Sequence, residues 1–510
     1  MAARAGSYRR GEAPRPLASR CSTRKGFDWP AAVGGSELEP MGSALAWCAV
    51  YTGSLAYATA SSNGGAAAAE DQSTRVLPTR QMCNLHGMYE IALNNRSEVP
   101  SVWLGLELSV NFTRPDGSSV LVPGYYDGRS TFRARAYCDM AGNWTWVSAA
   151  PYAGLQQAGS FSVLPLGSLP GKLRVHVEDR RQLQYANGSV FLHQGDTGYR
   201  YLVDSEPLWK PYIDQSAQAG ATKIRVWFCK GRHDINAVFE WGTANQSALG
   251  LALPYWQEMD RRLLYALEAH PSVQLEVIVY GEDRARILTY PTDPMTRYVG
   301  EYAQARWSAL PNVYWVLSND QHPVTGPPPY SSAPCGTARN LPWDLIDTIG
   351  RDFARREPWG TLISNHQCRT SGFAFGNTSW AGLVLLEDLD QVAGTRVAEY
   401  YRSSELPIIV DEDRYELYKG PEHPLYFFRR LMWGNLLSGG AATYGGLLTY
   451  LPYDGNISGV SGYFDAVGAG KLRGGMAAFP HIAQFFRAAL GANGTCSVQY
   501  WCIRQRQRGI

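Results

Sequence analysis

Residues 312–320 read NVYWVLSND, and this stretch decides how the rest of the chain is interpreted. Its apolar run is continuous rather than alternating, which is typical of a strand buried on both faces of a parallel sheet. The run ends abruptly on Asp320, although a carboxylate is costly to bury. Either this carboxylate is a solvated loop residue, or the strand serves to position it.

Seven further runs of this kind occur in the chain, and helical patterns separate several of them, at residues 255–269, 295–310, 343–356 and 424–438. Eight near-continuous strands that alternate with helices predict a (β/α)8 barrel, which we expect over residues 171–490. A doubly wound open sheet is the competing fold. No Gly-x-Gly-x-x-Gly follows the first strand, which argues against a dinucleotide site. The seven runs are FLHQGD (191–196), KIRVWF (223–228), LEVIVYG (275–281), LISNHQ (362–367), LVLLEDL (383–389), PIIVDED (407–413) and AATYGG (441–446).

Residues 78–170 follow a different pattern, in which apolar and polar residues alternate. Examples are MYEIALNN (88–95), TFRARAY (131–137) and NWTWVS (143–148), with Gly, Pro and Asn in the segments between such runs. Short alternating runs separated by turn residues predict an antiparallel β-sandwich. The chain is therefore expected to be a multidomain α/β protein. A spacer role for the sandwich is at least as compatible with this pattern as sugar binding.

The N-terminal segments have the composition of targeting sequences rather than of a folded domain. Residues 1–40 are rich in Arg, Pro, Gly and Ser, and we expect them to be disordered or to precede a true start at Met41. Residues 41–60 contain a short apolar stretch and two Ala-x-Ala sites, as in a signal peptide. Residues 61–77 are expected to be a linker, and residues 491–510 a short polar tail. The chain also carries eight Asn-x-Ser/Thr sequons, which predict a secreted glycoprotein; they begin at Asn95, Asn111, Asn143, Asn187, Asn245, Asn377, Asn456 and Asn493.

Charge and cysteine content exclude several classes of partner. The net charge of +2 gives no reason to expect nucleic acid. Apart from the leader, no segment has the roughly 18 apolar residues of a membrane span. The chain has nine cysteines but no Cys-x-x-Cys and no His-x-x-x-His, so neither a metal nor an organic cofactor is expected. Oligomeric state does not follow from the sequence. Three disulfide pairings are possible guesses, namely Cys83–Cys138, Cys335–Cys368 and Cys496–Cys502.

The predicted strands end in polar side chains that could form a hydrolytic site. In a barrel the carboxyl ends of the strands carry the active site. Asp320 follows strand four and Glu412 ends strand seven, on opposite sides of the mouth. Two carboxylates across a scissile bond are what glycoside hydrolysis requires, one protonated and one ionised. Like charges close together push their pKa values apart, which supplies one of each.

Four stretches of the predicted barrel carry a family resemblance, namely GDTGY (195–199), NVYWVLSND (312–320), LPIIVDEDRYE (406–416) and GGAATYGG (439–446). They resemble the apiosidase-like glycoside hydrolases, and the resemblance covers roughly residues 80–490. These enzymes are (β/α)8 barrels of the clan that has its acid/base after strand four and its nucleophile after strand seven. The sandwich, with VPGYYDGRSTFRARAYCDMAGNWTW (122–146), resembles the N-terminal β-domain of undefined function that often precedes such barrels.

The resemblance assigns roles to individual residues. Asp320 matches the acid/base and Glu412 the nucleophile. Asp196 matches an Asp expected to contact sugar hydroxyls, and Tyr415 with Glu416 matches the Tyr-Glu pair that follows the nucleophile. Many relatives in the wider clan have Asn-Glu after strand four, whereas this chain has Asn-Asp, as apiosidase-like members do. No C-terminal β-domain of the kind often found after such barrels is evident.

Other residues at the strand ends are predicted to bind substrate, and each has a structural alternative. The predicted set is Asp196, Arg225, Trp227, Asn319, His366, Glu387, Tyr415 and Tyr444. Asp196 could instead cap the first loop, and His366 could be a supporting hydrogen-bonding residue. Trp227 and Tyr444 could belong to the barrel core, since aromatic residues on strands usually do.

The charged residues of these runs raise further expectations. Glu282 or Glu387 could replace Asp320 as the acid. Arg225 lies in an apolar strand and needs a buried carboxylate partner, which would also help to hold the nucleophile ionised. Strand alternation is expected to place Asp411 and Asp413 on the opposite side from Glu412.

The sequence therefore predicts a secreted glycoside hydrolase that retains anomeric configuration. Carboxyl groups about 5–5.5 Å apart would fit retention, and about 6.5–9.5 Å would fit inversion. The alternative hypothesis is a catalytically inactive carbohydrate-binding or surface protein on a hydrolase scaffold, which the Asn-Asp pair and the missing C-terminal domain motivate. The distance between Asp320 and Glu412 discriminates between the two, together with an open cleft.

Overall fold

The structure is a computed structural model that describes twelve stretches of the chain. These are residues 82–95, 107–128, 130–167, 169–199, 201–202, 209–227, 239–240, 250–324, 340–368, 373–416, 421–446 and 476–490. All of them belong to one compact unit, Asp71–Ile510. The predicted leader, signal peptide, linker and C-terminal tail, at residues 1–77 and 491–510, lie outside the described residues.

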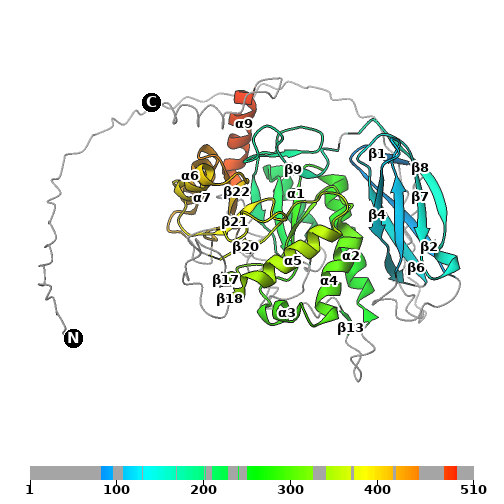
Figure 1. Ribbon diagram of the computed structural model, residues 1–510. Coiled ribbons are helices and arrows are strands. Elements are labelled where there is room, and N and C mark those ends of the chain that lie inside the picture. Colours follow the sequence, from blue (N-terminus) through cyan, green and yellow to red (C-terminus); the bar gives the residue numbers. More distant parts are fainter. Residues whose placement is uncertain are drawn as a thin grey trace, which may run out of the picture. The chain divides into compact units, whose positions relative to one another are not determined.

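Parallel strands with helices beside them form the larger part of the described fold (Figure 1), and their pairing closes them into a ring. Each strand pairs in parallel with its neighbour, and β23 pairs with β11 to close one side. A single residue separates β19 from β20; β19 pairs with β16 and β20 with β21, so together they occupy the fifth position. This confirms the predicted (β/α)8 barrel. The strands are β11 (Gly195–Thr197), β12 (Lys223–Trp227), β15 (Gln274–Ile278), β16 (Val313–Val316), β19 (Ile363–Ser364), β20 (His366–Gln367), β21 (Val384–Glu387), β22 (Ile408–Glu412) and β23 (Ala441–Tyr444).

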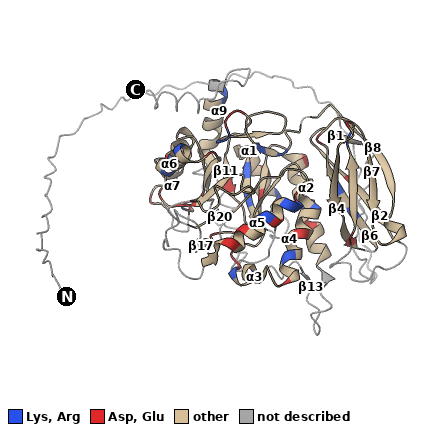
Figure 2. Cartoon of the chain, viewed as in Figure 1, with Lys and Arg blue, Asp and Glu red and all other residues tan. Residues whose placement is uncertain are grey.

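Helices follow most of these strands, and local sequence explains where some of them begin. Asp283 and Asp293 accept hydrogen bonds from the backbone N–H groups of Arg286 and Met295, and so cap α3 and α4. Basic and acidic residues both occur along α4 and α5, in agreement with the small net charge (Figure 2). The helices are α1 (Trp209–Ala219), α2 (Leu253–Ala269), α3 (Arg284–Thr289), α4 (Pro294–Trp307), α5 (Trp343–Arg356), α6 (Thr395–Ser403), α7 (Pro424–Leu437) and α9 (Phe479–Leu490), with a 3₁₀ turn η5 (Met476–Ala478) before α9.

Three two-stranded sheets of the described chain are separate from the barrel ring. β9 pairs with β10 and β13 with β14 in antiparallel fashion, whereas β17 pairs with β18 in parallel. None of the described helices is long and apolar enough to cross a membrane. The short strands are β9 (Leu173–Val175), β10 (Leu183–Tyr185), β13 (Phe239–Glu240), β14 (Gly250–Leu251), β17 (His322–Val324) and β18 (Asn340–Pro342).

The N-terminal region is the predicted sandwich of two sheets, with orders β1-β8-β7-β3-β4 and β2-β6-β5. All its strand pairs are antiparallel except β1 with β8. Along β2 buried and less buried residues alternate, as a sheet with one face on the core requires. The strands are β1 (Met82–Asn84), β2 (Met88–Asn94), β3 (Ser109–Thr113), β4 (Ser119–Pro123), β5 (Tyr125–Gly128), β6 (Thr131–Tyr137), β7 (Gly142–Ala149) and β8 (Ala158–Leu164), with a 3₁₀ turn η1 (Ala153–Leu155).

One of the guessed disulfides is present in the sandwich, where Cys83 is bonded to Cys138. Cys368 is also disulfide-bonded. The residue suggested for it, Cys335, lies outside the described residues, and so do Cys496 and Cys502.

Candidate active site

The two carboxylates singled out in the sequence lie together at the barrel mouth. Asp320 follows β16 and Glu412 is the last residue of β22. One oxygen of each lies within 4.8 Å of the other and of a ring nitrogen of His366. Only 3% of Asp320 and 7% of Glu412 is exposed, so water screens their mutual repulsion little. The fold thus brings together two groups that are 92 residues apart in the sequence.

Asp320 has a backbone conformation that few side chains adopt. Its φ is 50°, in the left-handed region, which Asp tolerates better than most residues. Its backbone N–H donates to Nδ1 of His366 (3.3 Å), and its Oδ1 lies 2.9 Å from the same nitrogen. The turn therefore directs the carboxyl of Asp320 onto the imidazole.

The imidazole of His366 can serve both protonation states of Asp320. Burial, followed by the charge of Arg225, lowers the pKa of His366 to about 3, so the ring is neutral. When Nε2 carries the proton, Nδ1 accepts a hydrogen bond from a protonated Asp320. When Nδ1 carries it, the ring donates to the Asp320 carboxylate and no longer accepts the backbone N–H of Asp320. An acid/base residue must occupy both states in turn.

Glu412 is held by two donors. Arg225 donates through Nη1 (3.1 Å) and the Tyr199 hydroxyl donates at 3.0 Å, both to Oε2. Burial first, and then the charge of Asp320, raise the pKa of Glu412 to about 7, although Arg225 acts in the opposite direction. A neighbouring carboxylate and a buried environment thus work against the ionisation that the arginine favours.

Arg225 is the centre of the site, and the prediction that it needs a buried carboxylate partner is confirmed. Besides Glu412, its Nε lies 3.3 Å from both Glu276 and Asp411, and its Nη2 donates to Asn319. The guanidinium also lies over the ring of Tyr199, 5.1 Å from the centroid. Arg225 therefore links the strand-four loop to the end of strand seven.

A layer of charged residues below the mouth was not predicted. The Lys223 ammonium contacts Asp411 and lies 2.8 Å from Glu276, and Tyr314 donates to Glu276 at 2.7 Å. Burial and Asp411 raise the pKa of Glu276 to about 7. Burial alone would raise the pKa of Asp411 as well, but Lys223 and Arg225 outweigh it and hold that pKa well below its ordinary value. The available signal was a Lys and a Glu inside otherwise apolar strands.

Strand alternation predicted only part of this arrangement. Asp413 is directed at the segment after β21, where it accepts the backbone N–H groups of Asp390 (2.8 Å) and Gln391 (2.9 Å). For Asp411 the prediction is wrong, because Arg225 contacts both Asp411 and Glu412. The pairing of β21 with β22 shifts register opposite Glu412, which interrupts the regular alternation.

The other predicted residues fall into two groups. Arg225, Asn319 and His366 contact the carboxylates or each other, as described above. Glu387 is the strand neighbour of Glu412 and further raises its pKa, after burial and Asp320. Buried Tyr415 lies close enough to Glu412 for that charge to act on its phenol, whose pKa burial raises well above its ordinary value.

Three predicted substrate contacts have structural partners. Both oxygens of Asp196 accept hydrogen bonds, from Tyr212 (2.6 Å) and from the backbone of Gly446 (3.2 Å), as a loop-capping role requires. Trp227 is buried against Tyr199, with ring centroids 4.7 Å apart. Tyr444 is buried with its ring 4.8 Å from that of Phe428. Both aromatic residues belong to the barrel core in this structure, so their contact with substrate stays a prediction.

Asp320, His366 and Glu412 also offer two carboxylate oxygens and one imidazole nitrogen within 4.8 Å of one another. Such a donor set could hold a divalent cation. Proton transfer accounts for the same arrangement, because His366 already contacts Asp320 and Arg225 already neutralises part of the charge on Glu412.

The fold and the site together define a class of protein. A parallel (β/α)8 barrel that brings two buried carboxylates together after strands four and seven is a glycoside hydrolase of the barrel type. The family model described as the apiosidase-like catalytic domain matches residues 177–448, more than half of the 510 residues. The chain belongs to this apiosidase-like family, as the resemblance of its sequence implied. A domain of unknown function, DUF5060, matches residues 84–150 of the sandwich.

One solved structure agrees with the fold over most of the chain. A candidate glycoside hydrolase from Bacteroides vulgatus is similar to this chain with a TM-score of 0.60 and 19% identity, covering 72% of each chain. A family 5 glycoside hydrolase from the same organism has a TM-score of 0.42 and 18% identity, over 54% of this chain and 63% of its own. No curated protein matches the chain.

Proposed function

We propose that the chain is an active glycosidase that retains anomeric configuration, with Glu412 as nucleophile and Asp320 as acid/base. The observation that carries the proposal is the distance between them. An oxygen of each carboxyl lies within 4.8 Å of the other. Inverting enzymes keep their carboxyl groups about 6.5–9.5 Å apart to admit a water, whereas retaining enzymes keep them about 5–5.5 Å apart. The 4.8 Å joins the nearest oxygens rather than the centres of the two carboxyl groups, and an approach this close favours the shorter, retaining range.

The reaction proceeds in two steps. A carboxylate oxygen of Glu412 forms a bond to the anomeric carbon while the bond to the leaving oxygen breaks, and Asp320 gives its proton to that oxygen. Asp320, now ionised, then takes a proton from water as the water oxygen attacks the anomeric carbon and releases Glu412. Arg225 and Tyr199 stabilise Glu412 whenever it carries charge.

Substrate recognition is divided between the residues of the mouth. We assign Arg225, Asn319 and His366 chiefly to holding the two carboxylates, because their hydrogen bonds are directed there. Glu387 and Tyr415 flank Glu412 and are proposed to contact sugar hydroxyls. The substrate is proposed to be an oligosaccharide or polysaccharide.

Secretion and glycosylation form part of the proposal. The disulfide between Cys83 and Cys138 favours an oxidising compartment. Among the described sequons, four have an exposed asparagine, as attachment of a glycan requires, and these are Asn111, Asn143, Asn187 and Asn377.

The test uses protein secreted from a gene that begins at Met41, assayed on a panel of aryl glycosides and on plant and algal polysaccharides. Wild type should release sugar, and Glu412→Gln and Asp320→Asn should lower kcat by several orders of magnitude. Glu282→Gln is the matched control, because the Glu282 carboxylate lies near the same loop, 3.5 Å from Asn319. A full loss in Glu282→Gln with activity left in Asp320→Asn would identify Glu282 as the acid.

The stereochemistry of the first product distinguishes the mechanisms. Proton NMR of the released sugar should show the anomer of the substrate, and the opposite anomer would overturn retention. A parallel assay with EDTA should show no loss, and a loss that added metal restores would replace the proton-transfer account. If no substrate is cleaved but glycans bind, the chain is an inactive carbohydrate-binding protein on this scaffold.

A further inference from the structure

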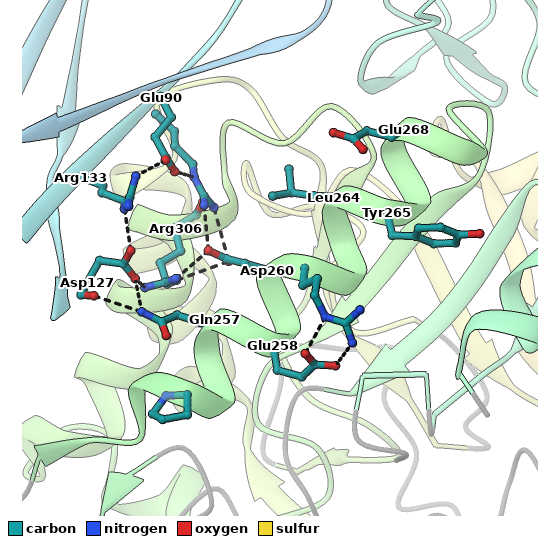
Figure 3. A pocket seen from close by; sticks show the side chains of 13 residues that line it. Glu90, Asp127, Arg133, Gln257, Glu258, Asp260, Leu264, Tyr265, Glu268 and Arg306 are labelled. Carbon is teal, nitrogen blue, oxygen red and sulfur yellow. Dashed lines mark hydrogen bonds and ion pairs between the residues drawn. The ribbon is translucent and has the colours of Figure 1, made fainter. Parts of the chain in front are cut away.

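The contact between the sandwich and the barrel contains a second cluster of buried charges, which we call the seam (Figure 3). The seam consists of Glu90, Asp127, Arg133 and Arg135 from the sandwich and of Asp260 on α2 and Arg306 on α4. These residues line the side of a cavity of about 440 Å³. Less than 7% of the surface of Asp260 and of each of the three arginines is exposed.

Arg135, on strand β6 of the sandwich, reaches between two barrel helices. Its Nη2 lies 2.7 Å from Asp260 on α2, and its Nη1 donates to the backbone carbonyl of Arg306 on α4 at 2.6 Å. Its Nε donates to Glu90 of the sandwich at 2.7 Å. One guanidinium from the sandwich therefore joins α2 to α4.

The seam is balanced in charge and in hydrogen bonds. Arg306 donates to Asp260 (2.6 Å) and Asp127 (3.0 Å), and Arg133 donates to Asp127 and Glu90. Three arginines thus meet three carboxylates, and every carboxylate oxygen accepts at least one hydrogen bond. The carboxylates of the seam are already satisfied by its own arginines, so the cluster favours a mechanical role over a binding site.

The apolar cores of the two domains also interlock. Tyr125 of the sandwich belongs to the core cluster of the barrel, where its ring meets Tyr302 edge-on at 6.1 Å. In return, Ala309 and Trp359 of the barrel belong to the core cluster of the sandwich, and the Trp359 ring lies 6.5 Å from that of Phe112. Neither core is complete without residues of the other domain.

A buried lysine just beyond the sandwich fixes the end of α4. The Lys172 ammonium donates to the carbonyl groups of Ser308 (2.6 Å) and Leu310 (3.0 Å), which follow the helix, and to the Thr361 hydroxyl (2.7 Å). A cation at a helix C-terminus satisfies free carbonyl groups. Strand β16 begins three residues after Leu310, and Asp320 follows that strand.

We propose that the sandwich is a permanent part of the enzyme that holds α4 in place, and thereby the strand that leads to Asp320. Arg135 is the principal positioning residue, and we call this set of contacts the clamp. The sandwich is then neither a detachable sugar-binding module nor a spacer. Tyr125, Lys172 and Trp359 complete the clamp. The clamp itself stands on the contacts of the seam, whereas its effect on Asp320 rests on the proposed function.

Calorimetry of the full secreted chain tests the clamp. Wild type should unfold in one transition, and Arg135→Met should lower its Tm by on the order of 5 °C or more, because it leaves Asp260 with one cation fewer. Arg355→Met is the matched control, since it removes an arginine whose side chain is 71% exposed from its pair with Asp352 on α5, and it should change Tm by about 1 °C or less. Arg135→Lys should recover part of the loss in Tm, because lysine keeps the positive charge but lacks the paired N–H donors of the guanidinium.

A double-mutant cycle shows whether the contact crosses the seam. Asp260→Asn combined with Arg135→Met should lower Tm by less than the two single losses together, because each single variant already breaks the same pair. Additive losses, or separate transitions for sandwich and barrel in wild type, would overturn the clamp. So would binding of a saccharide that Arg135→Met abolishes without a change in Tm.

Leaving-group dependence tests the effect on Asp320. At a temperature where it is fully folded, Arg135→Met should be slowed several-fold more on an alkyl glycoside, whose leaving oxygen needs a proton, than on a dinitrophenyl glycoside, which departs without one. Equal loss on both substrates would overturn the positioning role. If wild type cleaves neither, the proposed function fails and the role at Asp320 falls with it, while calorimetry still decides the clamp.

Discussion

The seam and the barrel mouth are both buried clusters of arginine and carboxylate, but they differ in the ratio of cations to carboxylates. At the seam, three arginines face three carboxylates and every carboxylate oxygen is bonded. Around Arg225 the described residues supply two cations, Arg225 and Lys223. The carboxylates that surround them are Asp320, Glu412, Glu276, Asp411 and Glu387.

This difference is visible in the pKa values. Burial alone would raise the pKa of Asp260, but Arg135 and Arg306 reverse the effect and hold it well below its ordinary value. Burial and Asp320 raise the pKa of Glu412 to about 7, because a single arginine does not offset them. Balanced charge gives a fixed ionic state that stabilises a contact, whereas an excess of carboxylates leaves protons to be exchanged near neutral pH.

The largest effect is expected from removing the central cation of the mouth. Arg225→Met should lower kcat/KM by about 10²–10³, because it removes a hydrogen-bond donor from Glu412. It should also lower the free energy of unfolding by about 3–5 kcal/mol, because it leaves buried carboxylates without their cation. Steady-state kinetics and denaturant unfolding measure the two quantities. Arg225→Lys keeps the charge and should lose less stability than Arg225→Met. Unchanged kinetics in Arg225→Met would separate this cluster from the reaction.

At the seam the corresponding change should affect stability far more than chemistry. Asp260→Asn leaves Arg135 and Arg306 without their shared carboxylate and should cost about 3–5 kcal/mol of unfolding free energy. The same variant, assayed well below its Tm, should keep kcat within about tenfold of wild type. A catalytic loss as large as that of Arg225→Met would contradict the division of roles between the two clusters.

The pH dependence of stability should distinguish the two clusters by sign. Since the pKa of Glu412 is raised above its unfolded value, its contribution to stability is present at low pH and is lost as pH rises through about 7. Glu412→Gln should therefore gain on the order of 1–3 kcal/mol relative to wild type between about pH 4 and pH 8. The pKa of Asp260 is lowered, so its contribution is lost only as pH falls below the ordinary range of an Asp.

Denaturant unfolding of Glu412→Gln and Asp260→Asn at several pH values measures this difference. Glu276→Gln serves as the matched control, because it removes a second carboxyl with a pKa near 7. The kcat/KM of wild type should rise with pH up to about 7, because the nucleophile must be ionised. A constant difference between Glu412→Gln and wild type would mean that Glu412 has an ordinary pKa.

An exposed ion pair should show the smallest effect and so calibrates the other changes. The Arg261 side chain is 49% exposed and lies 2.7 Å from Glu258 at the rim of the seam cavity. Arg261→Met should change the free energy of unfolding by less than about 0.5 kcal/mol, because solvent screens the pair. A loss of several kcal/mol would mean that the rim belongs to the clamp.

Local pattern was sufficient for the architecture. Runs such as KIRVWF and NVYWVLSND have the length and continuity of buried strands, and all eight predicted runs are barrel strands in the structure. Strand order then follows from the alternation with helices, and the carboxyl ends share one mouth. Asp320 and Glu412 could be paired for this reason, with the resemblance supplying their roles.

The sequence by itself thus determined the fold, its two domains and the pair of carboxylates, because hydrophobic period and strand order are properties of the chain. Only the tertiary structure decided which charges meet. Lys223 and Glu276 face Asp411 across the barrel, a register shift brings Glu412 to the same arginine as Asp411, and Arg135 joins helices more than a hundred residues downstream. Burial and distance set those partnerships and their pKa values, and neither is written in the local pattern of residues.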